Sequence, residues 1–171
     1  MKVAIDSQCY SYLIAAFEGI GPPDGQLASQ KISLVRTFFY VSAPYVPDTV
    51  RAEYLRISDV NKLQLHTSWS VVFPDLHTAA DHSAVMRRAQ MLLPAHRKLA
   101  DCQIVSECEM SGVTTLLSYD NDLINRLAGQ TSITIIRPLD HWVSLGLDPN
   151  ASPALIPSPG NPLGAQTWWR M

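Results

Sequence analysis

Two short apolar runs that each end in an aspartate constrain the fold of this chain most. Val3-Ala-Ile is followed by Asp6, and Val113-Thr-Thr-Leu-Leu-Ser-Tyr is followed by Asp120. Apolar runs of this length, bounded by polar residues and followed by helical patterns, predict buried strands of a parallel sheet. Ligands bind outside the carboxyl ends of such strands, and we expect both aspartates to lie there.

The remainder of the chain alternates between the same two kinds of pattern. Strands are predicted at 2–6, 44–47, 70–73, 113–118 and 132–136, and helices at 7–17, 26–41, 48–58, 76–93, 99–111 and 123–127. Asp48 or Thr49 is the expected cap of the third helix. The alternation predicts an α/β fold with a central parallel sheet of four to five strands flanked by helices, in three α/β/α layers.

The composition divides the chain into a domain and a tail. With 171 residues, 47% of them hydrophobic, the chain is long enough for one compact domain. Five of the 12 prolines fall between Pro149 and Pro162, which predicts a domain over 1–147 and an extended tail over 148–171. No window approaches 18 uninterrupted apolar residues, and no membrane span is expected.

The cysteines indicate a reducing compartment. Cys9, Cys102 and Cys108 are odd in number and form no CxxC pair, which argues against a disulfide framework. We therefore expect a cytoplasmic protein in which the three thiols serve as small buried hydrophobic side chains.

Two further acids lie on the apolar faces of predicted helices. Helical spacing places Glu53 in a stripe with Val50, Tyr54 and Ile57, and it places Asp101 in a stripe with Ile104, Val105 and Cys108. A lone carboxylate in such a place costs several kcal/mol unless it is paired or bound to a metal. Helix capping is an alternative role for Asp101. We do not expect these two acids, or the two strand-end aspartates, to be needed for the stability of the fold.

Convergence of these four acids predicts a metal site. Like charges that lie close together repel unless a cation neutralises them. Oxygen ligands without Cys or His favour Mg²⁺ or Mn²⁺ over zinc, and such ions catalyse phosphoryl chemistry, of which phosphodiester hydrolysis is the natural case. Ser7 and Ser118 are candidates to hold a water or a phosphate oxygen, although turn formation explains them equally well.

Any nucleic-acid contact must come from a local basic patch, because the formal net charge is −2. The candidate cations for RNA phosphates are Arg87, Arg88, Arg97 and Lys98, and a solvated helix face is the alternative. Glu107 and Glu109 are expected on a solvated face of the 99–111 helix.

Four segments in order resemble a known family. They are Val-Ala-Ile-Asp6-Ser, Tyr-Val-Pro-Asp-Thr-Val-Arg-Ala-Glu53-Tyr-Leu, Leu-Ala-Asp101-Cys-Gln-Ile-Val-Ser-Glu and Val-Thr-Thr-Leu-Leu-Ser-Tyr-Asp120-Asn-Asp. Over residues 2 to 143 the chain resembles PIN domains, and its compact form is similar to VapC-type toxin ribonucleases. The resemblance implies a metal-dependent endoribonuclease with Asp6, Glu53, Asp101 and Asp120 as catalytic and metal-binding acids, and Asp122 as an auxiliary ligand. It also implies RNA as substrate, an antitoxin protein as partner, and a homodimer.

The chain departs from the family pattern at three places. Cys102-Gln103 follows the third acid where small apolar residues are usual, residues 19–25 lengthen the first connection, and the tail lies outside the pattern. A non-catalytic PIN-like module that binds RNA or protein, and a housekeeping RNA-processing nuclease, are the alternatives. A phosphatase is disfavoured because Gln8 stands where that class needs a second aspartate.

Overall fold

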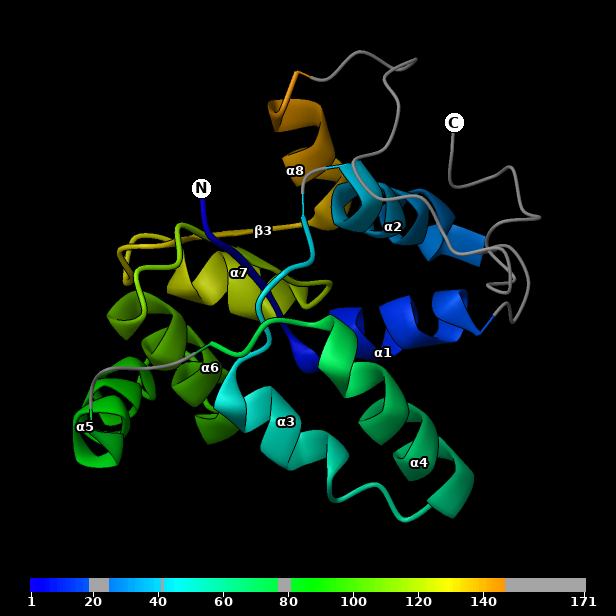
Figure 1. The fold of residues 1–171 in the computed structure, drawn as a ribbon. Coiled ribbons are helices and arrows are strands. Elements are labelled where there is room, and N and C mark those ends of the chain that lie inside the picture. Colours follow the sequence, from blue (N-terminus) through cyan, green and yellow to red (C-terminus); the bar gives the residue numbers. More distant parts are fainter. Residues whose placement is uncertain (19–24, 41, 77–80, 147–171) are drawn as a thin grey trace.

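A computed structural model describes residues 1–18, 25–40, 42–76 and 81–146 (Figure 1). The fold is mixed α/β, and its sheet contains the parallel strands β1 (Val3–Ile5), β2 (Thr115–Leu117) and β3 (Thr134–Ile136) in the order β1-β2-β3. Leu116 pairs with Ala4 on one side and with Ile135 on the other. The predicted α/β class and parallel sheet are confirmed, with three strands in the described residues.

Two further segments continue the sheet beyond β1 as isolated bridges. Tyr45 pairs with Ala4, and Val46 pairs with Asp75, both in parallel. Main-chain hydrogen bonds support the first pairing, since Ile5 N donates to Tyr45 O at 3.1 Å and Tyr45 N donates to Val3 O at 2.8 Å. The predicted segment 44–47 therefore lies beside β1.

The predicted strand at 70–73 is wrong. Ser70–Val72 forms a 3-10 helix, η2, in which the Val71 side chain is 85% exposed. A buried strand would have covered this valine, whereas here only Phe73 of the segment enters the core. The bridge to the sheet comes two residues after Phe73, at Asp75.

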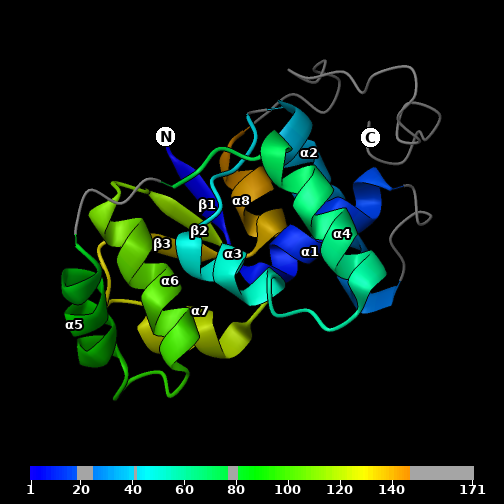
Figure 2. The ribbon, with the colours of Figure 1, turned by 60° about the horizontal axis from the view of Figure 1, so that its bottom comes forward.

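Helices flank the sheet on both sides. In Figure 2, α5 and α6 lie on one side of the strands, whereas α1, α2, α4 and α8 gather on the other. In chain order the helices of the described residues are α1 (Ser7–Phe17), the 3-10 helix η1 (Gly25–Leu27), α2 (Ala28–Tyr40), α3 (Asp48–Tyr54), α4 (Val60–Trp69), α5 (His82–Leu92), α6 (Leu99–Met110), α7 (Asn121–Leu127) and α8 (Pro138–Ser144).

Most predicted helices agree with the structure, and their ends show what sets their length. Helix α1 has the predicted bounds, and α6 stops before Gly112, whose φ of 68° is the left-handed conformation that ends helices. Helix α3 ends at Tyr54 instead of 58, and its cap is Pro47 rather than Asp48 or Thr49. Helix α5 begins at His82, and 77–80 of the predicted helix lie outside the described residues.

Two helices have no counterpart among the predicted elements. Helix α4 begins where the Asp59 side chain accepts from Lys62 N at 3.0 Å, and His66 is its buried residue. Helix α8 begins at Pro138, a residue whose fixed φ suits the first helical turn. The predicted loop at 19–25, except Gly25, and the predicted tail at 148–171 lie outside the described residues.

The core lies between the sheet and its helices. All three residues of β1 are buried, and an aromatic cluster of Tyr10, Phe17, Phe38 and Phe73 packs beside them. The three cysteines are free and buried, as expected from the sequence. Within the described residues, no helix has the length and apolar character needed to cross a membrane.

Candidate metal centre

Asp6 lies directly after β1 and has two structural contacts. Its Oδ1 accepts from Cys9 N at 2.7 Å and so caps α1, while its Oδ2 accepts from Ser118 Oγ at 2.5 Å. The side chain is buried, and this burial raises the pKa of Asp6 despite the opposing effect of the bonds from Ser118 and Cys9. The nearby charge of Asp101 raises that pKa further.

Asp120 ends the neighbouring strand segment and caps α7. Its Oδ1 accepts from Asp122 N at 2.8 Å and Leu123 N at 3.2 Å, and its Oδ2 lies 2.8 Å from Lys98 Nζ. Partial burial would raise the pKa of Asp120, but the bonds from Lys98 and the helix amides lower it below its usual value. The expectation that the strand-end acids have no structural role is therefore wrong, because each one caps a helix.

The hydroxyl of Ser118 joins these two acids. It donates to Asp6 Oδ2 and accepts from Asp120 N at 3.0 Å. Ser118 is fully buried, and these bonds fix the ends of β1 and β2 to each other. The water or phosphate contact predicted from the sequence stays a prediction.

Asp101 lies in the first turn of α6 and is held by two side chains. Its Oδ2 accepts from His96 Nε2 at 2.7 Å and lies 3.6 Å from Lys98 Nζ. His96 is 2% exposed, and sequence reasoning missed it because its position follows no apolar periodicity. The turn between α5 and α6 brings it back to Asp101. These side-chain contacts replace the capping role considered for Asp101.

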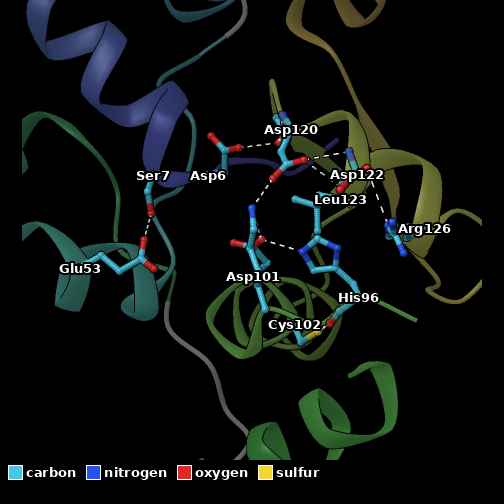
Figure 3. Close-up of polar contacts among 12 residues, drawn as sticks. Asp6, Ser7, Glu53, His96, Asp101, Cys102, Asp120, Asp122, Leu123 and Arg126 are labelled. Atoms are coloured by element: carbon cyan, nitrogen blue, oxygen red, sulfur yellow. Dashed lines mark hydrogen bonds and ion pairs between the residues drawn. The ribbon is translucent and has the colours of Figure 1, made fainter. Parts of the chain in front are cut away.

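Glu53 reaches the same region from α3, where its carboxylate accepts a hydrogen bond from Ser7 Oγ. A cavity of about 200 Å³ collects all four acids, and we call it the acid cavity. Figure 3 shows Asp6, Asp101 and Asp120 on facing elements, with Glu53 and Ser7 to one side. The cavity is lined by Asp6, Ser7, Gln8, Glu53, Lys98, Asp101, Ile104, Asp120 and Leu123.

The acid cavity has the chemistry of a site for a hard cation. Its charged groups are four carboxylates and the Lys98 ammonium, which shows that a cation is already accommodated against Asp120 and Asp101. The hydrogen bond to Asp120 raises the pKa of Lys98 most, and the charge of Asp101 raises it further. The described residues contain no preformed group of three acidic, His or Cys ligands. Oxygen donors of this kind fit Mg²⁺ or Mn²⁺, which the four acids would hold.

Asp122, the predicted auxiliary ligand, lies outside the acid cavity lining. Its side chain is 70% exposed and pairs with Arg126 at 3.7 Å, one turn further along α7. The reason is helical geometry: Asp120 precedes α7 as its cap, whereas Asp122 is already in the first turn.

The four predicted RNA-binding cations have different surroundings. Arg87 and Arg97 are exposed. Arg88 forms a bidentate pair with Glu109 at 2.7 and 3.0 Å and also donates to Gln130 O. Lys98 is engaged in the acid cavity. Arg88 and Lys98 thus contact carboxylates, although the Lys98 side chain is itself 63% exposed, and an RNA contact by any of the four stays a prediction.

Glu107 and Glu109 do not lie on a solvated face, contrary to expectation. Glu107 is buried and accepts from Thr49 N at 3.1 Å and Thr49 Oγ1 at 2.6 Å. The side chain of Glu109 is 10% exposed. The expectation fails because α6 packs against both α3 and α5, and these neighbours cover faces that a single amphipathic stripe would leave open.

Comparison with known proteins adds no relative to this description. A scan against protein-family models and a search of curated proteins both find no match.

Proposed function

We propose that this protein is a Mg²⁺- or Mn²⁺-dependent endoribonuclease that hydrolyses RNA phosphodiester bonds in the acid cavity. One observation carries the proposal: four acids from four separate parts of the chain line one cavity at the carboxyl ends of β1 and β2. Asp6 and Asp120 follow the strands, whereas Glu53 and Asp101 come from α3 and α6. This is the position at which parallel α/β sheets bind ligands.

The surrounding contacts support catalytic roles for these acids. Asp6 is fixed by Cys9 N and Ser118, and Asp101 by His96, so these carboxylates are oriented before any ligand arrives. Glu53 lies with Ser7 to one side of the other three acids and is the proposed group that orients the attacking water. A bound Mg²⁺ or Mn²⁺ would polarise the phosphate and stabilise the leaving oxygen.

The resemblance to PIN domains and VapC-type toxins is part of this proposal. The bridges at Tyr45, Val46 and Asp75 support a sheet of four to five strands in three α/β/α layers. Arg87 and Arg97 would contact RNA phosphates. By the same resemblance, an antitoxin would fill the acid cavity, and two chains would form a dimer in the cytoplasm.

Cleavage of a structured RNA tests the proposed activity. The wild-type protein should cut RNA with Mg²⁺ or Mn²⁺ and stop when the metal is chelated. Asp6→Asn and Asp101→Asn should each lower the rate on the order of 100-fold. Asp122→Asn removes one acid outside the cavity lining and should retain activity. A lack of cleavage of any RNA by protein that binds metal contradicts the proposal.

One observation favours a second function, a PIN-like module that binds RNA or protein without cutting. Lys98 neutralises part of the acid cavity without a metal, as a purely structural cluster would require. Calorimetry separates the two, because the binding module predicts no Mg²⁺ or Mn²⁺ binding. For the nuclease, a neighbouring reading frame encoding a small DNA-binding protein favours a toxin over a housekeeping enzyme.

A further inference from the structure

Lys98 links two acids that belong to different elements. It is the residue before α6, and its Nζ lies 2.8 Å from Asp120 Oδ2 and 3.6 Å from Asp101 Oδ2. Both carboxylates line the acid cavity together with Lys98 itself. The Lys98 ammonium therefore lies between two carboxylates, one at the N-terminal end of α6 and one at the N-terminal end of α7.

Asp101 has two partners, His96 and Lys98, and they differ in how firmly the surrounding structure holds them. The His96 side chain is 3% exposed, and it can leave Asp101 only if the surrounding structure opens. The Lys98 side chain is 63% exposed, and its flexible stem can swing into solvent without disturbing the core. Ion pairs this exposed contribute little to stability, so the contact is easily exchanged.

A divalent ion and this ammonium compete for the same carboxylate oxygens, Oδ2 of Asp120 and of Asp101. Mg²⁺ binds oxygen at about 2.1 Å, while Lys98 Nζ is 2.8 Å from Asp120 Oδ2. Two cations on one oxygen would lie within a few ångströms of each other and repel. Metal binding through Oδ2 of Asp120 or Asp101 is therefore opposed by the ammonium and favoured when the ammonium leaves.

We propose that Lys98 is a tethered counter-cation that neutralises the acid cavity in the metal-free protein and competes with the divalent ion for Asp101 and Asp120. This inference rests on the proposed metal-dependent function. It assigns Lys98 to the control of metal loading, a role different from the RNA phosphate contact predicted from the sequence. Without Lys98, the acids repel one another more strongly but are open to the metal.

Arg97 supplies a matched control. It is the adjacent residue, it is exposed, and it does not line the acid cavity. Arg97→Gln and Lys98→Gln each remove one positive charge from the same turn, and only the second removes a cation from the carboxylates. Lys98→Met, which keeps the aliphatic stem, is a second neutral variant. Lys98→Arg keeps a cation at the site.

Titration calorimetry with Mg²⁺ and with Mn²⁺ on the full chain, at constant ionic strength, tests the inference. Lys98→Gln and Lys98→Met should bind the metal about fivefold more tightly than wild type, the size expected for release of two exposed ion pairs. Arg97→Gln should stay within about twofold of wild type, and Lys98→Arg should resemble wild type. In metal-free thermal unfolding, Lys98→Gln should melt below Arg97→Gln, and added metal should remove that difference.

The possible failures are distinct. Equal or weaker metal binding by the neutral Lys98 variants overturns the inference and leaves the proposed metal site intact. An equal gain in metal affinity in Arg97→Gln also overturns it, because the gain would then come from the lower net charge of the protein and not from the contacts of Lys98. If neither the wild type nor Lys98→Gln binds Mg²⁺ or Mn²⁺, the inference and the proposed function both fail.

Discussion

At the residue scale, the buried contact between His96 and Asp101 decides how one acid of the cavity points. Partners of this kind typically change metal affinity by about 10- to 100-fold when they are removed. His96→Ala should therefore weaken Mg²⁺ binding at least about tenfold in calorimetry. His96→Gln, whose amide can donate to Asp101, should recover part of the loss. Unchanged affinity in the alanine variant would show that Asp101 needs no such support.

The residues of the candidate site were predictable in part. Asp6 and Asp120 follow apolar runs, and Glu53 and Asp101 interrupt apolar stripes, so local patterns were sufficient to find all four lining acids. His96 and Lys98 act through the turn that joins α5 to α6. The approach of His96 to Asp101 depends on the path of the chain after Leu92, which no spacing in the sequence encodes. Lys98 precedes Asp101 by three residues, so that contact follows helical spacing, whereas its contact with Asp120 depends on the tertiary fold.

At the element scale, Asp120 serves both as the cap of α7 and as a wall of the acid cavity, and substitutions can separate these roles. Asparagine is as good a cap as aspartate, whereas alanine at such a position costs about 1 kcal/mol. In urea titrations, the free energy of unfolding of Asp120→Ala should therefore be about 1 kcal/mol lower than that of Asp120→Asn. Both variants should bind the metal more weakly than wild type. Equal stability of the two variants would mean that the capping bonds contribute nothing.

Elements were predicted well where the apolar pattern reports burial and poorly where it does not. Helix α1 buries six of its residues on regular spacing and has the predicted bounds. Helix α4 buries only His66 and is defined by the Asp59 cap, so its apolar pattern is weak. The apolar run Val71-Val72 indicated a strand, yet Val71 is exposed, because an apolar residue is free to lie at the surface.

At the scale of the whole molecule, Glu109 ties α6 to α5 and to the loop before β3. It accepts from Arg88, from Thr131 Oγ1 at 2.6 Å and from Ser132 N at 2.9 Å. Partial burial would raise the pKa of Glu109, but Arg88 and the loop donors together lower it below 4.5. A lowered pKa means that the folded state favours the charged form.

The stabilisation from Glu109 should accordingly be complete above pH 4.5 and disappear as the pH falls through its lowered folded-state value. Glu109→Gln should unfold with a free energy about 2 kcal/mol lower than wild type at pH 7. At a pH below 4.5 the difference in unfolding free energy between the two proteins should shrink as the pH falls. Urea titrations at neutral and at lower pH measure this, and a difference that does not depend on pH would assign the effect to packing.

The proposed metal also has a consequence for the entire fold, because an ion that binds only the folded state stabilises that state. Mg²⁺ at about 100 times its dissociation constant should add about 2.7 kcal/mol. For a chain of this size that amounts to a rise of about 5 to 10 °C in Tm. Circular dichroism with Mg²⁺, compared with NaCl at equal ionic strength, measures the shift. Asp101→Asn should not respond, since it lacks one of the acids of the cavity. An equal rise in that variant would place the ion elsewhere on the protein and remove the acid cavity from the argument for catalysis.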